Sequence, residues 1–248
     1  MRFEQYANKT KLVWSGCSGT ILNEQYVLSA AHCAKPTYFN YSFPPPTHVV
    51  VKEHNITDDS DGQSVANICN WTVHDSYEKK TIRFDFAIAS LKQPIVFDDK
   101  AAPACLPVPW EMRQDDFFVG KTLTASGWGD LGYGLGDSDV LMKVDLIAQS
   151  NDDCNKVFLG KDNVSRIYPE MLCAGGRKAT PTQAVCHGDS GGPLTYTNEK
   201  GVTTVVGVVS WGKGACPGLP YPGVFSRVTS VLNWITETMH KDVRQCYL

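Results

Sequence analysis

A serine set among glycines is the residue best suited to nucleophilic chemistry in this 248-residue chain. It is Ser190, within the sequence GDSGGP at residues 188–193. Glycine permits a tight turn and lets a substrate approach the backbone closely. Such a turn can expose the hydroxyl and direct successive N–H groups at one point, as stabilisation of an oxyanion requires. Taken alone, the segment is equally typical of a glycine-rich surface turn.

A histidine and an aspartate could complete a proton-transfer system with this serine. His32 follows an apolar run in the sequence VLSAAHC at residues 27–33. By itself, this pattern favours a packed core histidine over a catalytic one. Asp85 lies in the apolar sequence FDFAIA at residues 84–89. Burying a carboxylate there is costly unless a partner, such as an imidazole N–H, hydrogen-bonds to it.

The elements that must position these residues are short, and their pattern predicts an all-β fold. Apolar and β-branched runs are separated by Gly, Pro, Asn and Asp, which indicates a sandwich or a barrel. The sequence APACLPVPW at residues 102–110 indicates an extended connector between two β halves. Apolar residues at i, i+3 and i+4 predict a helix over 230–239, and residues 152–158 are a candidate for a second short helix. The clearest strand-like runs are Thr20–Leu22, His48–Val51, Lys121–Ala125 and Val202–Ser210.

Composition and charge exclude several classes of protein. The chain is 42% hydrophobic and 20% charged, which is ordinary for a soluble globular protein. Its net charge of -3 gives no reason to expect nucleic acid or an anionic membrane as a partner. No apolar run approaches the roughly 20 residues needed to span a bilayer.

Five short motifs in a fixed order resemble the trypsin- and chymotrypsin-like serine proteases, peptidase family S1. They are AAHC at 30–33, Asp85 at the head of an apolar strand, SGWG at 126–129, GDSGGP at 188–193 and SWG at 210–212. The resemblance implies two antiparallel six-stranded β-barrels and a C-terminal α-helix in a single domain over 1–248. The first barrel would span 1–102, the connector 103–118, the second barrel 119–229 and the helix 230–241.

The same resemblance implies a catalytic role for each motif. Ser190 would be the nucleophile, His32 the general base, and Asp85 the group that orients His32 and stabilises its imidazolium form. The N–H groups of Gly188 and Ser190 would form the oxyanion hole. The reaction would be the hydrolysis of peptide bonds through an acyl-enzyme, which makes the chain a serine endopeptidase acting on proteins or peptides.

The specificity pocket is implied in the same way. In the family, the position six before the nucleophile forms the pocket floor, and here it is Ala184. Gly212 and Gly223 match the pocket walls and leave it open, while Ser210 and Trp211 belong to the segment that pairs with the substrate backbone. An uncharged floor cannot compensate a buried cation, so we expect a preference for large apolar or aromatic side chains.

Nine cysteines favour an oxidising compartment. The resemblance implies three disulfides, Cys17–Cys33, Cys154–Cys173 and Cys186–Cys216. Cys69, Cys105 and Cys246 then remain, so at least one lacks a partner within the chain. In many relatives the cysteine that matches Cys105 bonds an upstream chain or propeptide, although a Cys69–Cys105 bridge or one through Cys246 is also open.

Glycosylation sequons support the same compartment. They begin at Asn8, Asn40, Asn55, Asn70 and Asn163. Together with the cysteines they predict a secreted, extracellular glycoprotein. We expect a monomer that protein protease inhibitors could bind.

The acidic residues between Glu53 and Asp61 could form either a calcium site or an ordinary solvated loop. Glu53, His54 and Asn55 resemble the start of the family's calcium loop, and Asp58, Asp59 and Asp61 follow. The second glutamate expected near Ser64 is absent, and calcium needs six to eight oxygen ligands. A solvated acidic loop is the favoured interpretation, and no cofactor is expected.

The start of the chain departs from the family. Active members begin with a new N-terminus, usually Ile-Val-Gly-Gly, whose ammonium pairs with the aspartate before the nucleophile, here Asp189. The chain begins with MRFEQYANK instead, and residues 1–19 do not resemble a signal peptide. The expectation is therefore a longer gene product and a poorly active, zymogen-like chain as written.

Two rival functions compete with the endopeptidase. One is a non-catalytic serine protease homologue that acts as a binding or regulatory protein, but such homologues usually lose a triad residue. The other is a cysteine- and glycan-rich adhesion module, which leaves the five ordered motifs unexplained.

Overall fold

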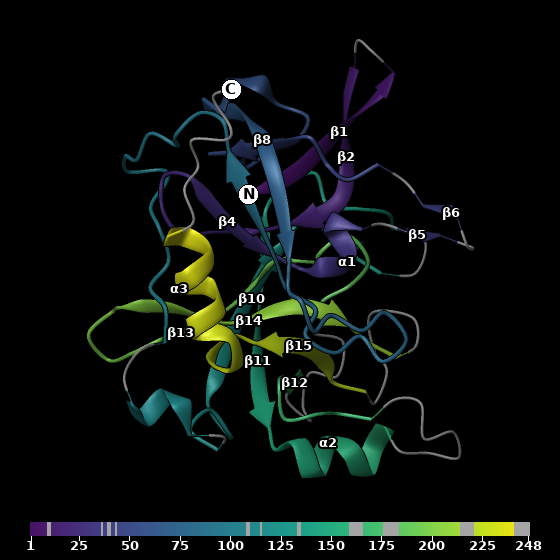
Figure 1. The fold of residues 1–248 in the computed structure, drawn as a ribbon, viewed down its shortest axis with the longest axis vertical. Helices are drawn as coiled ribbons and strands as arrows, with labels where there is room; N and C mark the ends of the chain where they lie inside the picture. Colours follow the sequence, from purple (N-terminus) through teal and green to yellow (C-terminus); the bar gives the residue numbers. More distant parts are fainter. Residues whose placement is uncertain are drawn as a thin grey trace.

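The structure is a computed structural model of residues 1–248, shown in Figure 1. It describes the chain except for residues 9–10, 36, 39–40, 43, 108–109, 115, 133–134, 159–165, 176–183, 214–220 and 241–248. Within the elements, the description of residues 5–8, 11–15, 37–38, 41–42, 59 and 111 is limited to the backbone.

The first half of the chain forms an antiparallel sheet of seven strands in the order β2-β1-β7-β8-β9-β4-β3, in purple and blue in Figure 1. One strand more than the predicted six is present, because Gly19 interrupts the run from Lys11 to Ile21. A Cβ at Gly19 would lie 2.7 Å from Val27 Cγ1, so only glycine fits there. The strands are β1 Arg2–Asn8, β2 Lys11–Ser18, β3 Thr20–Ile21, β4 Tyr26–Ser29, β7 His48–Val51, β8 Ser64–Val73 and β9 Ala87–Leu91.

The second half forms a closed antiparallel barrel in the order β10-β11-β12-β15-β14-β13, in teal, green and yellow in Figure 1. β10 alternates buried and less buried residues with the period of two expected when one face covers a core. β14 is buried along nearly its whole length. The strands are β10 Thr122–Gly127, β11 Met142–Gln149, β12 Met171–Gly175, β13 Pro193–Thr197, β14 Thr203–Trp211 and β15 Gly223–Arg227.

Helices are short and few among the described residues. α3, Leu232–His240, follows the 3₁₀ turn η3, Val228–Val231, close to the bounds predicted for the C-terminal helix. α2, Asn151–Phe158, matches the second predicted helix. The prediction of an all-β fold with two antiparallel units and a C-terminal helix is confirmed. The remaining elements are α1 Ala31–Ala34, η1 Asp59–Asp61, η2 Trp110–Arg113, β5 Thr37–Tyr38 and β6 Tyr41–Ser42.

The described residues form three buried apolar clusters, and one of them contains residues of both halves. The first core contains Phe3, Leu28 and Ile88 of the sheet, and also Val208 of β14 and Ile235 of α3. Full burial of each such side chain contributes about 1.5–3 kcal/mol. The barrel has its own core, built on Leu123, Leu146, Leu172, Leu194 and Phe225. The shared core fixes β14 against the sheet, and this matters for the site because Ser210 lies on β14.

None of the helices that the structure describes has the length and apolar character needed to cross a bilayer.

Candidate active site

The carboxylate of Asp85 accepts hydrogen bonds from both halves of the molecule. Asp85 lies just before β9 and is fully buried. Its Oδ1 accepts from the backbone N–H of His32 at 2.9 Å, and its Oδ2 lies 2.8 Å from His32 Nδ1. Ser210 Oγ donates to Oδ2 at 2.6 Å from the second half. These bonds offset the cost of burying the charge and fix the direction of the His32 ring.

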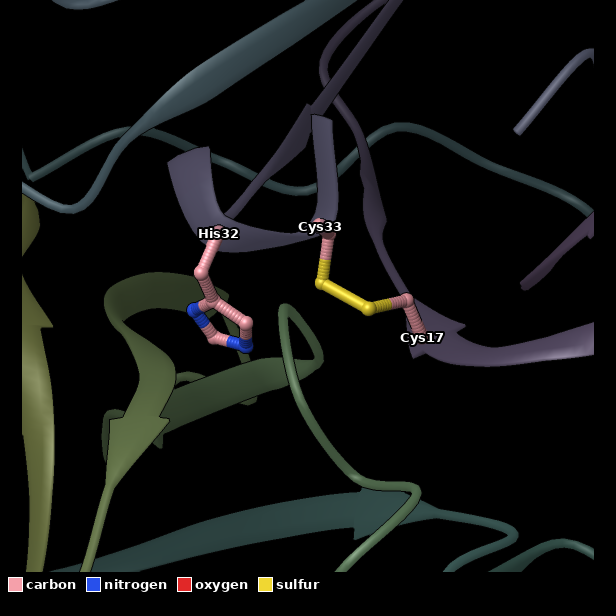
Figure 2. A group of neighbouring side chains, drawn as sticks. All are labelled: Cys17, His32 and Cys33. Carbon is pink, nitrogen blue, oxygen red and sulfur yellow. A yellow bond between two sulfur atoms is a disulfide. The ribbon is translucent and has the colours of Figure 1, made fainter. Parts of the chain in front are cut away.

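His32 is presented by α1, a helix of one turn tied to β2 by a disulfide. Cys33 of α1 bonds Cys17 of β2 at an S–S distance of 2.01 Å. Figure 2 shows the His32 ring extending away from α1, toward the ribbon of the second half. Its neighbours Ala31, Cys33 and Ala34 are buried, whereas the His32 side chain is 30% exposed. The ring is therefore held at one edge and open at the other.

Asp85 makes His32 a stronger base than a free imidazole. Burial disfavours the imidazolium, but the charge and the hydrogen bond of Asp85 outweigh burial and raise the pKa of His32 above its ordinary 6.5. A histidine with such a pKa can accept a proton near neutral pH and return it in a later step.

The group of Cys17, His32 and Cys33 in Figure 2 has the composition of a metal site but not its chemistry. Its potential ligand atoms lie within 4.8 Å of one another. The two sulfurs are bonded to each other, however, so neither is available as the thiolate that a metal requires. The disulfide is a structural link that holds α1.

The turn that carries Ser190 packs against the sheet at the residues before α1. The carbonyl of Ser190 accepts from the N–H of Ser18 at 2.7 Å, and the N–H of Gly191 donates to Val209 O at 2.8 Å. A Cβ built on Gly191 would lie 3.2 Å from the backbone nitrogen of Ala30, two residues before His32. The structure thus brings the serine, histidine and aspartate segments to one place.

Gly191→Ala is expected to destabilise the protein more than an equally strained substitution elsewhere. Gly191 has φ +74°, and an added Cβ would overlap Ser29 Oγ and approach Ser18 O to 2.5 Å. Overpacking of this kind typically costs about 1–3 kcal/mol of folding stability, so the Tm should fall. Gly201→Ala is the matched control, since φ is +76° but no atom lies within 4 Å. Equal Tm values for the two variants would contradict the prediction.

Three backbone N–H groups of this turn remain available among the described contacts. The N–H groups of Asp189, Gly191 and Gly192 donate to Cys186 O, Val209 O and Asp189 O at 2.8–3.1 Å. Within the described part of the chain, no acceptor is hydrogen-bonded to the N–H of His187, Gly188 or Ser190. Gly188 has φ +95°, a conformation that favours glycine. Both groups predicted to bind an oxyanion, at Gly188 and Ser190, are thus among the three without an acceptor in the described structure.

Asp189 is a half-buried residue whose carboxylate accepts hydrogen bonds from backbone groups. Its Oδ1 accepts from Gly129 N at 2.9 Å and its Oδ2 from Cys186 N at 2.8 Å. Burial raises the pKa of Asp189 despite these bonds, and the charge of Asp137 adds to the rise. A cavity of about 200 Å³ adjoins it, and among the described residues no cation forms an ion pair with it. The apolar lining residues include Leu131, Met142, Val144 and Val185.

The structure describes the residues predicted for the specificity pocket, but only part of the chain around them. Ala184 is exposed and lines the cavity at Asp189. A Cβ on Gly223 would lie 3.2 Å from both Val185 Cγ2 and a ring carbon of Phe225, so a larger residue would fill this space. Nothing lies within 4 Å of a Cβ on Gly212, and Trp211 packs edge-on against Phe158. The intervening segments 176–183 and 214–220 lie outside the described residues.

Two of the three predicted disulfides are confirmed, Cys17–Cys33 and Cys154–Cys173. Cys186 is also disulfide-bonded, but its predicted partner Cys216 lies outside the described residues, as does Cys246. Cys69 is disulfide-bonded as well, and Cys105 is a free, exposed thiol.

The predicted sequons differ in accessibility. Asn70 is exposed on β8. Asn55 is half-buried, and its Oδ1 accepts from both the N–H and the hydroxyl of Thr57. Asn40 and Asn163 lie outside the described residues, and of Asn8 only the backbone is described.

The acidic loop uses its carboxylates to hold its own backbone. Asp61 Oδ2 accepts from the N–H groups of His54 and Asn55 at 2.9 and 2.6 Å, and Asp58 caps η1 through Ser60 N. Glu53 is buried and forms an ion pair with Arg2 at 3.0 Å.

Three contributors to the site were not among the predicted residues. Ser226 Oγ donates to the carbonyl oxygen of Asp85 at 3.1 Å. Burial and, to a smaller extent, the charge of Asp85 raise the pKa of Tyr77, so this phenol stays protonated. Gly129 belongs to the quoted SGWG motif, but its bond to Asp189 depends on the folded turn. Only Gly129 had a signal in the sequence.

Comparison with known proteins agrees with this geometry. A family model described as Trypsin matches residues 5–235. Trypsin 5G1 of Aedes aegypti is 35% identical over 221 residues, covering 89% of this chain and 74% of that protein. Brachyurin of Leptuca pugilator is 33% identical over 220 residues, covering 88% and 85%. Serine proteinase stubble of Drosophila melanogaster is 30% identical over 223 residues, which are 89% of this chain but 27% of stubble. The chain belongs to the trypsin family of serine proteases.

Proposed function

We propose that the chain is a serine endopeptidase in which Ser190 attacks the carbonyl carbon of a peptide bond. One observation carries the proposal: the buried Asp85 holds His32 by its ring and its backbone, and in the glycine turn no described acceptor binds the N–H groups of Gly188 and Ser190. A histidine packed only for stability would not need a buried carboxylate fixed from a second element by Ser210.

In the first half of the reaction, His32 Nε2 removes the hydroxyl proton of Ser190 while Oγ bonds to the carbonyl carbon. The carbonyl electron pair moves onto oxygen, and Asp85, still ionised, stabilises the imidazolium. The imidazolium then gives its proton to the amide nitrogen as the C–N bond breaks, which leaves an acyl-enzyme. In the second half, His32 deprotonates a water that attacks the ester, and the proton returns to Ser190 Oγ.

The oxyanion of each tetrahedral intermediate would lie between the N–H groups of Gly188 and Ser190. Both are free to donate, and both belong to a turn held by the other backbone bonds of residues 186–192. Such preorganised donors need no rearrangement at the moment of reaction, and each is worth about 2.7–4 kcal/mol.

Substrate would add as an extended strand along residues 210–212. β14 ends at Trp211, and a register shift between Val209 and Trp211 makes Ser210 the extra residue of a bulge. The Ser210 side chain meets Asp85, while Gly212 is exposed with open space beside it. An exposed strand end of this kind suits backbone pairing with a peptide.

We expect cleavage after Phe, Tyr or Leu to exceed cleavage after Arg by at least about tenfold in kcat/KM. Ala184 provides no carboxylate, so a cation bound there would be buried without a partner. The comparison uses peptide amides that differ only at the residue before the scissile bond. It uses the extended chain, meaning this sequence preceded by residues that start Ile-Val-Gly-Gly. Ala184→Asp should shift the preference toward Arg, and faster cleavage after Arg in the parent would contradict the pocket assignment.

The cavity beside Asp189 is the proposed seat of an activating N-terminus. It offers the half-buried Asp189 carboxylate and a wall that is partly apolar, which together suit an α-ammonium followed by aliphatic side chains. Asp130 and Lys143 also line it. An inserted ammonium would neutralise Asp189 and stabilise the turn that carries Ser190. Gly127 and Gly129 leave room for the Asp189 side chain, because a Cβ at either position would overlap it.

The dipeptide Ile-Val should raise the Tm of the chain, whereas acetyl-Ile-Val, which lacks the ammonium, should not. Saturation at 100 times Kd corresponds to about 2.7 kcal/mol of added stability. Binding needs ionised Asp189, whose pKa is raised, and a protonated amine, whose ordinary pKa is about 8. Affinity should therefore increase as pH rises through the pKa of Asp189 and decrease above about pH 8. If the Asp189→Asn variant bound Ile-Val as tightly as the wild type does, the cavity beside Asp189 would not be the binding site of the ammonium.

Secretion and a disulfide to another chain are the remaining parts of the proposal. The confirmed disulfides favour an oxidising compartment. The backbone of Cys105 is fixed to β14 by bonds to Thr203 O and from Val205 N, and its thiol is exposed. That combination suits a link to an upstream chain.

A further inference from the structure

The segment immediately before Asp85 has an unfavourable backbone conformation. Ile82 has φ +54° and Phe84 has φ +49°, in the left-handed region that β-branched and bulky residues avoid. Such a conformation persists only where surrounding contacts impose it. Because Phe84 is adjacent to Asp85, relaxation of its φ would redirect the backbone that carries the carboxylate.

Arg83, between these two residues, connects the segment to the second half of the molecule. Its Nε donates to Oε1 of Glu170, and its guanidinium lies 4.3 Å from the ring centre of Tyr168. The Glu170 side chain is 6% exposed, so its carboxylate is paired and largely desolvated. The guanidinium also lies 5.6 Å from the Phe84 ring, and Phe84 stacks on His74 with the ring planes 10° apart.

The partner Glu170 is linked back to Asp85 along β15. The N–H of Arg227 donates to Glu170 O at 2.9 Å, and Arg227 Nε donates to Met171 O at 3.1 Å. The residue before Arg227 is Ser226, whose hydroxyl donates to Asp85 O at 3.1 Å. The contacts close a ring that runs from Asp85 through Arg83, Glu170 and β15 back to Asp85.

We infer that Arg83 is a positioning residue: held by Glu170 and Tyr168, it keeps the strained residues 82–84 in place and so aims the Asp85 carboxylate at His32. The inference rests on the proposed function, because it assigns Arg83 to the same triad. Arg83 need not contact substrate. Its effect on the reaction passes through the hydrogen bond between Asp85 and His32.

The direct test is the pKa of His32, read by NMR in the chain labelled at its six histidines. Arg83→Ala should lower this pKa by about one pH unit, since a displaced Asp85 no longer offsets burial. The sign is diagnostic, because loss of a positive charge acting through space would raise the pKa. A downfield resonance from a hydrogen-bonded Nδ1–H should weaken in parallel.

Three variants make the result specific. Arg83→Met with Glu170→Met leaves no unpaired buried charge, so it guards against simple misfolding and should lower the pKa of His32 as Arg83→Ala does. Arg83→Lys keeps a cation opposite Glu170, so the pKa of His32 should stay closer to its wild-type value than in Arg83→Ala. Arg166→Ala is the matched control: it removes another cation near Tyr168, at 5.7 Å, and should leave the pKa unchanged.

An unchanged or raised pKa of His32 in folded Arg83→Ala or in the double methionine variant would overturn the inference. Labelling of the extended chain by a fluorophosphonate separates this failure from failure of the proposed function. Labelled wild type with an unmoved pKa would refute the role of Arg83 alone. Unlabelled wild type with the expected fall in pKa would refute the catalytic function and leave the positioning contact standing.

Discussion

Ser190→Ala is expected to lower kcat of the extended chain by about 10⁶-fold toward a peptide amide, the scale of loss when a serine nucleophile is removed. The methyl group cannot form the acyl-enzyme, and the proton transfer through His32 loses its donor. The oxyanion donors and the substrate strand remain, so KM should change little. The measurement is the steady-state rate at saturating substrate, with the protein shown to be folded by its Tm.

Ser150→Ala is the control for this change. Ser150 is a polar residue before α2 whose hydroxyl donates to Asp153, away from the triad, so its replacement should leave kcat unchanged. Retention of more than a tenth of kcat by Ser190→Ala would mean that another group attacks the substrate.

Asp85→Asn is expected to lower kcat by about 10²–10⁴-fold and to move the pH dependence to lower pH. In the wild type, activity should fall as pH decreases through the pKa of His32, which Asp85 raises above 6.5. Without the Asp85 charge, burial of the imidazole acts unopposed, and the pKa should fall below 6.5. The measurement is kcat/KM across pH 5–9.

Asp145→Asn removes one negative charge elsewhere and serves as the control. Asp145 lies on the outer side of β11, where it accepts from Thr124 Oγ1, so its neutralisation should not move the pH profile. If kcat/KM of Asp85→Asn fell over the same acid pH range as that of the wild type, this fall would not reflect the titration of His32 beside Asp85.

The raised pKa of His32 also makes the free energy of unfolding depend on pH. A base whose folded-state pKa is raised binds its proton more tightly in the native protein. The contribution of His32 is therefore fully present below pH 6.5 and is lost as pH rises through its folded pKa. Asp85→Asn is expected to remove this pH-dependent contribution to the free energy of unfolding, in addition to lowering kcat.

Much of the fold and the centre of the site could be predicted from the sequence, because the signals were local. The apolar β-branched run His48–Val51 is β7 with the same bounds. Asp152–Phe158 was a candidate helix, and α2 starts one residue earlier. Asp85 stood out as a charge within an apolar strand, and the structure provides the imidazole partner that its burial requires.

What could not be predicted depends on contacts between distant segments or on unfavourable local conformation. Arg83 and Glu170 are 87 positions apart, and no periodic pattern connects them. The left-handed conformation of Phe84 opposes its own propensity, so sequence rules exclude it. Ser226 of β15 contacts Asp85 from 141 positions away, and β15 is aligned there by pairing with its neighbour β14.

The strands at the start of the first unit were predicted only in part. The run Thr20–Leu22 was recognised, and β3 covers Thr20–Ile21. The preceding strand β2, Lys11–Ser18, was not assigned from the sequence.

The most direct measurement is fluorophosphonate labelling, because the reagent captures only a serine activated as a nucleophile. It compares the extended chain with its Ser190→Ala variant, each analysed by mass spectrometry of the labelled peptide. The account predicts rapid labelling at Ser190 in the extended chain and none in Ser190→Ala. Absence of labelling in a folded extended chain, or labelling at a residue other than Ser190, would contradict the assignment of the triad.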